Sequence, residues 1–234
     1  MSENTNFDNY LFLSPKKFII LINEGTNQTE IYRKEFIVEN NSNQIDYEIL
    51  DSFLESNIFD IEKKIKNFIN KLHLIIDNDK FFITQISSKR KNNKNYLSKN
   101  EIIYSLNEIK DSCKKTLEDK KIIHMIIERF VIDNNEFFNL PNNLKCDNFS
   151  LDVKFITLPE NLVKILENIL KKYQISIDKI LSADYVKGFF AQDEHNLFQS
   201  AKKLIDGCNE NEIQFVTKTE ENKGFFEKFF DLFS

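Results

Sequence analysis

Residues 121–133 read KIIHMIIERFVID, and this stretch does most to decide the fold. Ile, Val and Phe dominate it, and these residue types favour β-strands over helices. The run is far shorter than the ~20 apolar residues that a membrane-spanning helix needs. It therefore predicts a long strand in the middle of the chain.

Further strands are predicted on both sides of this run. A short apolar stretch at Phe18–Ile22 and a β-rich stretch at Thr29–Val38 flank a turn at Asn23–Gln28, which indicates a β-hairpin. Shorter strands are expected over residues 80–87, 151–158 and 175–181.

Helical spacing of apolar residues predicts four helices between these strands. They are expected over residues 58–73, 98–117, 159–172 and 184–205. The second has Ser98 three residues before Glu101, as in a capping box. The last is expected to bend near Gly188 and to stop at Gly207. Strands and helices that alternate in this order predict an α+β fold of small sheets with packed helices.

The composition excludes several classes of protein. The formal charge is −5, with 41% hydrophobic and 29% charged residues, which is typical of a globular chain and not of a general polyanion binder. Three cysteines without a CxxC pair exclude a disulfide framework and a cysteine-rich zinc site. No membrane-spanning run or signal peptide is recognisable, so we expect a cytoplasmic protein without nucleic-acid partners.

Catalytic and metal sites are not predicted. His73, His124 and His195 lie in three different predicted elements and show no metal-ligand spacing. Cys113 falls on the apolar stripe of a helix, and the basic stretch 89–94 is expected to be a solvated loop. The sequence therefore predicts no enzyme, no metal and no cofactor.

The turn after the first apolar run is a weak candidate for nucleotide binding. Asn23, Gly25 and Thr26 resemble a phosphate-binding hairpin in shape, but a single glycine is typical of any β-turn. Neither GxxxxGK[ST] nor GxGxxG occurs in the chain.

The last twelve residues, 223–234, form the sharpest local pattern. As a helix they would be strongly amphipathic, behind a polar linker at 208–222. The apolar face would carry Phe225, Phe226, Phe229, Phe230, Leu232 and Phe233. We expect this face to bind a membrane surface or a protein groove; the alternative is that it folds back onto its own domain.

The middle of the chain resembles FtsA, the actin-like family of the bacterial division ring. Residues 123–133 look like a strand of that family's inserted subdomain, which has strand–helix–strand–strand topology, and 151–157 look like its next strand. Residues 139–144 are similar to the turn between them but lack both of its glycines. The last twelve residues look like the family's membrane-targeting helix.

The resemblance implies a truncated, divergent version of the N-terminal part of this fold. The implied organisation is a disordered lead at 1–17, part of an actin-like subdomain at 18–88, the inserted subdomain at 89–182, a closing helix at 183–207, the linker at 208–222 and the terminal helix at 223–234. Within 89–182, the helix residues Ile102–Ile109 and Leu162–Ile169 are expected to pack on a common sheet.

The implied function is that of a non-catalytic adaptor at the division ring, on the inner face of the cell membrane. Divisome proteins and self-association through residues 89–182 are the expected contacts, while the subdomain that usually binds FtsZ is not recognisable. The second phosphate loop of the family is also not recognisable, and Asn23 replaces the aspartate of the first. The alternatives are a residual nucleotide-dependent switch and an actin-like protein of pilus assembly.

Overall fold

The computed structural model describes residues 7–25, 28–39, 42–141, 144–190 and 197–214. The chain divides into two compact units. The first contains the residues up to Lys80 and Asn161–Asp206, and the second contains Phe81–Glu160 and the residues from Gly207 onward. The predicted mixed α+β fold with two small sheets is confirmed.

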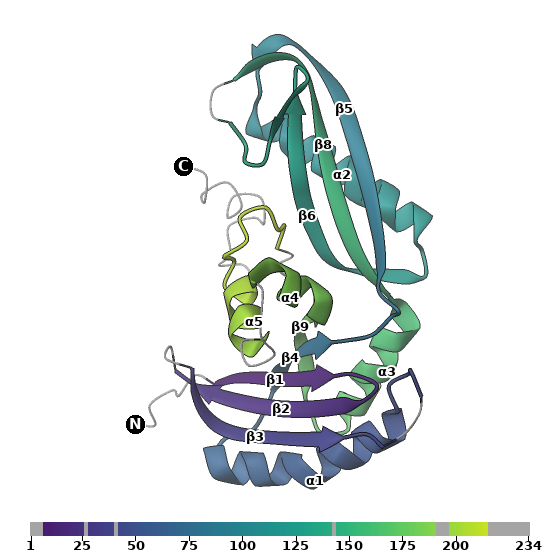
Figure 1. The fold of residues 1–234 in the computed structure, drawn as a ribbon, viewed down its shortest axis with the longest axis vertical. Helices are drawn as coiled ribbons and strands as arrows, with labels where there is room; N and C mark the ends of the chain where they lie inside the picture. Colours follow the sequence, from purple (N-terminus) through teal and green to yellow (C-terminus); the bar gives the residue numbers. More distant parts are fainter. Residues whose placement is uncertain (1–6, 26–27, 40–41, 142–143, 191–196, 215–234) are drawn as a thin grey trace. The chain divides into compact units, whose positions relative to one another are not determined.

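The first unit is built on a five-stranded sheet (Figure 1). In spatial order its strands are β3 (Thr29–Ile37), β2 (Lys17–Glu24), β1 (Phe7–Leu13), β4 (Lys71–Ile76) and β9 (Ser176–Ser182). The first three pair antiparallel, which confirms the predicted hairpin, whereas β4 runs parallel to both of its neighbours.

Helices cover both faces of this sheet (Figure 1). One face holds α1 (Tyr47–Ile65) and α3 (Glu160–Lys171). The rings of Phe53 on α1 and Phe18 on β2 lie 6.0 Å apart, and the Tyr173 hydroxyl donates a 2.9 Å hydrogen bond to Asp51 on α1. The other face packs against α4 (Ala183–Phe190) and α5 (Leu197–Ile205) through one apolar cluster, which includes Tyr10 and Phe12.

The second unit places one long helix on a four-stranded antiparallel sheet. Its elements are β5 (Phe82–Tyr96), α2 (Lys99–Thr116), β6 (Lys120–Ile132), β7 (Asn135–Phe137) and β8 (Lys145–Pro159), with the spatial order β5-β8-β6-β7. Apart from the short β7, this is the strand–helix–strand–strand order. The predicted capping box is present, since Ser98 Oγ accepts from the Glu101 amide and Glu101 Oε2 accepts from the Ser98 amide.

Two predictions for the first unit are wrong. Residues 7–13 of the expected lead form β1 at the centre of the sheet, because Tyr10–Leu13 is an apolar run that the sheet buries on both faces. The helix predicted at 58–73 starts at Tyr47 and ends at Ile65, where Lys66 adopts a left-handed conformation. The residues from Lys71 to Ile76 continue as β4.

The second unit also corrects the sequence interpretation. The basic stretch 89–94 lies within β5 and is not a loop. The helices α2 and α3 belong to different units, so Ile102–Ile109 and Leu162–Ile169 do not share a sheet. The units therefore do not follow the predicted ranges 18–88 and 89–182.

The structure also differs from the predicted organisation of the C-terminal part of the chain. The predicted closing helix at 183–207 is two helices, α4 and α5. Part of the predicted linker is ordered, because Ile213 is buried in the core beneath α2 and its amide donates to the Met125 carbonyl at 2.8 Å. The expected terminal helix at 223–234 lies outside the described residues.

Replacing Leu166 by Ala tests the orientation of α3. Leu166 is 1% exposed, so its truncation should lower the free energy of unfolding by ~2–5 kcal/mol in a urea titration. Ile165→Ala is the matched control, because Ile165 is 39% exposed and Ala favours helix; it should cost about 0.5 kcal/mol or less. Equal costs for both variants would contradict the described packing.

Candidate functional site

The β2–β3 turn contains the predicted nucleotide-binding candidates. Gly25 has a φ of +67° and its carbonyl accepts a hydrogen bond from the Gln28 amide, which closes the turn. Asn23 is only 5% exposed, and its Nδ2 donates to Gln28 Oε1 at 3.1 Å. Gln28 Nε2 in turn donates to Asp8 Oδ2 on β1 at 2.5 Å. The Asn23 and Gln28 side chains thus form a chain of hydrogen bonds that ends at Asp8 on β1. Thr26 lies outside the described residues.

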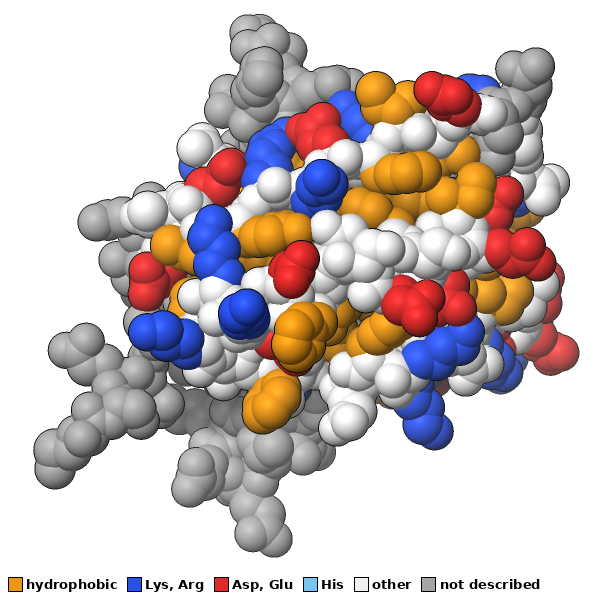
Figure 2. All heavy atoms as spheres, turned by 90° about the horizontal axis from the view of Figure 1, so that it is seen from below, with side chains coloured by type: hydrophobic (Ala, Val, Ile, Leu, Met, Phe, Trp, Pro, Cys, Tyr) orange, Lys and Arg blue, Asp and Glu red, His pale blue; other side chains and the backbone are white. Residues whose placement is uncertain are grey.

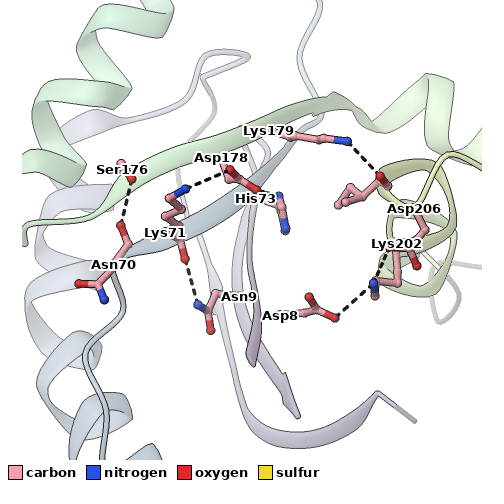
Figure 3. Close-up of polar contacts among 11 residues, drawn as sticks. Asp8, Asn9, Asn70, Lys71, His73, Ser176, Asp178, Lys179, Lys202 and Asp206 are labelled. Carbon is pink, nitrogen blue, oxygen red and sulfur yellow. Dashed lines mark hydrogen bonds and ion pairs between the residues drawn. The ribbon is translucent and has the colours of Figure 1, made fainter. Parts of the chain in front are cut away.

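A cluster of ionisable residues lies beside this turn, and we call it the edge cluster: Asp8, His73, Asp178, Lys202 and Asp206 (Figure 3). Because β1, β4 and β9 are parallel, their first residues meet at one edge of the sheet, where α5 ends. Lys202 Nζ lies 2.5 Å from Asp206 Oδ1 and 3.7 Å from Asp8 Oδ2. His73 Nδ1 lies 3.7 Å from Asp178 Oδ2.

Hydrogen bonds to backbone carbonyls continue along the same edge (Figure 3). Asn9 Nδ2 donates to the Lys71 carbonyl at 2.9 Å, and Ser176 Oγ donates to the Asn70 carbonyl at 3.0 Å. Lys179 Nζ donates to the Ile205 carbonyl at the last turn of α5 at 3.0 Å. A cation there suits the negative end of the helix dipole. These bonds fasten three strands and one helix end together.

Burial keeps two groups at this edge uncharged, the Tyr10 hydroxyl and the His73 imidazole. Burial, reinforced by Asp8 and Asp206, raises the pKa of the Tyr10 hydroxyl well above its ordinary range, so the phenol stays protonated. Burial also lowers the pKa of His73 below its usual value of 6.5, although Asp178 and Asp8 oppose that shift. His73 is therefore neutral at pH 7.

The contacts of the edge cluster indicate a structural role, because its charged groups pair with one another. Lys202 balances charge on the Asp8 and Asp206 carboxylates, and a phosphate group at the turn would be repelled by the Asp8 carboxylate beside it. Within the described residues, no group of three or more His, Cys, Asp or Glu side chains is placed to hold a metal ion. Every helix among these described residues is too short or too polar to span a bilayer.

The other residues that the sequence analysis considered do not lie in the edge cluster. His124 Nδ1 lies 2.6 Å from Glu212 Oε1 in the second unit, as a buried and satisfied sheet residue. Cys113 lies on the buried face of α2, as predicted, while Cys208 is exposed. His195 and the predicted membrane-binding residues Phe225, Phe226, Phe229, Phe230, Leu232 and Phe233 lie outside the described residues.

Sequence reasoning missed the edge cluster. Asp8 and Lys202 are far apart in the chain, and no local spacing connects them. One signal was available: parallel strands bring their first residues to a common edge, so polar residues at strand starts, such as Asp8 and His73, are candidates for proximity.

Comparisons with known proteins found similar solved structures but no similar sequences. Neither a protein-family model nor a curated protein sequence matches the chain. One similar structure is the cytoplasmic domain of EpsL, an inner membrane component of the type II secretion system of Vibrio cholerae, at 11% identity and a TM-score of 0.41 over 81% of this chain and 61% of that one.

Two more similar structures belong to the same comparison. The PilM–PilN type IV pilus biogenesis complex is 7% identical, with a TM-score of 0.48 over 76% of this chain and 48% of that one. A Bacteroides thetaiotaomicron protein with an actin-like ATPase fold and unknown function is 10% identical, with a TM-score of 0.34 over 78% and 55%. The chain spans about half to three fifths of the length of these structures.

The depressed pKa of His73 predicts a pH dependence of stability. Below the usual value of 6.5 the unfolded chain binds a proton at His73 that the folded chain does not, so the free energy of unfolding should fall as the pH is lowered from 6.5. One such group contributes at most ~1.4 kcal/mol per pH unit. His73→Phe, measured by urea titration between about pH 7 and pH 5, should flatten this dependence. An unchanged slope would show that His73 is not the responsible group.

Proposed function

We propose that this chain is a non-catalytic assembly protein on an actin-like core, which connects protein partners to the inner face of a membrane. The observation that carries the proposal is the strand–helix–strand–strand unit inserted between β4 and α3. This is the topology that the resemblance to the FtsA family implied for its inserted subdomain, the part with which that family contacts other proteins.

The inserted unit is built so that it leaves the sheet of the first unit complete. Its two ends are paired strands, since Phe82 on β5 lies opposite Thr157 on β8. The chain therefore leaves and returns at neighbouring points, and β4 still pairs with β9. An insertion of this kind supplies surface for contacts at little cost to the host sheet.

The candidate site supports a binding role over a catalytic one. The amides at the β2–β3 turn are bonded to one another and to Asp8, and Lys202 already bridges two carboxylates. The groups that could hold a nucleotide phosphate are thus engaged in holding the sheet edge.

The proposal also concerns the cellular machinery in which this protein would act. The division ring is the setting that the sequence resemblance implied. A type II secretion system and a type IV pilus are the settings named for two of the similar structures. No described residue favours the division ring over these two, and an actin-like protein of secretion or pilus assembly fits the same proposal.

Titration calorimetry with ATP and Mg²⁺ tests the non-catalytic part. We expect no binding below a dissociation constant of about 1 mM, because an anion at the turn would be repelled by the Asp8 carboxylate. Gln28→Ala, which releases the Asn23 amide, is the control and should not create binding. A micromolar, Mg²⁺-dependent affinity would favour the nucleotide-dependent switch instead.

Liposome co-sedimentation tests the membrane part. The six apolar residues between Phe225 and Phe233 are proposed as the anchor, at ~1.5–3 kcal/mol for each large side chain buried. Phe226→Asp with Phe229→Asp should abolish binding, whereas Asn222→Asp with Ser234→Asp, which adds the same charge, should keep it. Because Lys223 and Lys228 are offset by Glu227 and Asp231, binding should depend weakly on salt. Unchanged binding by the Phe226→Asp, Phe229→Asp variant would contradict this anchor.

A further inference from the structure

The four-stranded sheet of the second unit has one edge that is covered by the chain itself and one edge that no described strand covers. On one edge, β7 pairs with residues 130–132 of β6. Beyond it, the Ile127 amide donates to the Asn211 carbonyl at 2.9 Å, and the Ile213 amide donates to the Met125 carbonyl at 2.8 Å. This edge is therefore covered by the chain itself.

The opposite edge is the outer side of β5 (Figure 1). β5 pairs with β8 along its inner side, in regular register from Phe82 to Lys91. In the part of the chain that the structure describes, no strand pairs with its outer side. Its sequence contains no proline that would prevent pairing. An edge strand of this length presents a row of backbone amide and carbonyl groups that can pair with another strand.

The two faces of β5 differ in chemistry. On the α2 side, Ile86 packs against the core, and Arg90 forms an ion pair with Glu108 and lies over the Tyr104 ring. On the opposite side, Gln85 donates to Glu128 at 2.7 Å and Ser87 donates to Asp152 at 2.6 Å. The polar residues in the first half of this face are therefore already partnered.

Lys89 and Lys91 continue that same face and are exposed. The residues opposite them on β8 are Ser150 and Asn148, which carry no charge. Neither lysine side chain has an ion pair or hydrogen bond with another described residue. Two adjacent positive charges on the open edge are thus uncompensated within the described chain.

We propose that the outer edge of β5 binds an extended, acidic segment of a partner protein as an added strand. Its main chain would pair with β5. Acidic residues at alternate positions would lie beside Lys89 and Lys91, and the apolar residues between them would lie on the side of Ile86, since neighbouring strands place side chains ~5 Å apart. This inference rests on the proposed function, because it names the surface and the chemistry of the partner.

Other occupants and other surfaces fit less well. A second copy of the chain, paired antiparallel at this edge, would bring lysines together, and like charges across two strands destabilise them. On β3, one of the two edge strands of the first sheet, Arg33 forms an ion pair with Glu35. On the face seen in Figure 2, apolar side chains reach the surface in separate places between charged ones.

Fluorescence anisotropy with a labelled eight-residue peptide, in which Glu alternates with Val, tests the inference on the full chain. Lys89→Glu with Lys91→Glu should weaken binding by about tenfold or more. Lys114→Glu with Lys115→Glu is the matched control, because it makes the same change of charge at exposed positions of α2; it should weaken binding less than about twofold. Melting temperatures of both variants verify that they fold.

Hydrogen exchange locates the bound peptide. Bound peptide should slow amide exchange in residues 82–91 and leave residues 130–137 at the other edge unchanged. Equal affinity for both charge variants, protection at the other edge, or pairing of two copies through β5 would each overturn the inference. Liposome co-sedimentation distinguishes failure of this inference from failure of the proposed function. Membrane binding without peptide binding would reject the β5 edge alone. Peptide binding without membrane binding would reject the membrane role alone.

Discussion

The parallel pairing of β4 with β9 is the interaction on which the rest of the structure depends. These strands are neighbours in the first sheet, yet residues 77–175 lie between them in the chain. Their pairing aligns Ile75 with Leu181, both buried against α4 and α5. Closing a connection of this length costs entropy that grows only slowly with the number of residues. Burial of these side chains opposes that cost.

This constraint explains how the second unit is attached. A connection between two parallel neighbours must return to the same sheet, and here it does so as a unit whose terminal strands, β5 and β8, pair with each other. The inserted sheet is then closed on its β7 side by local chain and by residues 211–213, while β5 remains an edge. The features that support a binding role therefore arise from the connection and not from the first sheet, whose polar edge is occupied by structural bonds.

The sequence predicted elements where local chemistry determines them. Ser98 and Glu101 define a helix start within four residues, and the runs around residues 18–38 and 121–133 are strongly β-forming. The predictions from sequence were wrong where pairing between distant strands determines the secondary structure. Ile69 and Leu72 continue the spacing of α1, but Leu72 belongs to β4, because the continuous apolar run Leu74–Ile76 is buried on both faces of the sheet. The edge cluster was not predicted, because its members are far apart in the chain and meet only once three parallel strands are aligned.

We infer that the second unit is an insertion into a first unit that is complete without it. The most direct measurement is urea unfolding of a chain that ends at Asp206 and in which a short Gly-Ser linker joins Lys80 to Asn161 in place of residues 81–160. We expect a single cooperative transition with native-like circular dichroism, because the five-stranded sheet and its four helices keep their cores. A non-cooperative transition, or loss of secondary structure in buffer, would contradict it.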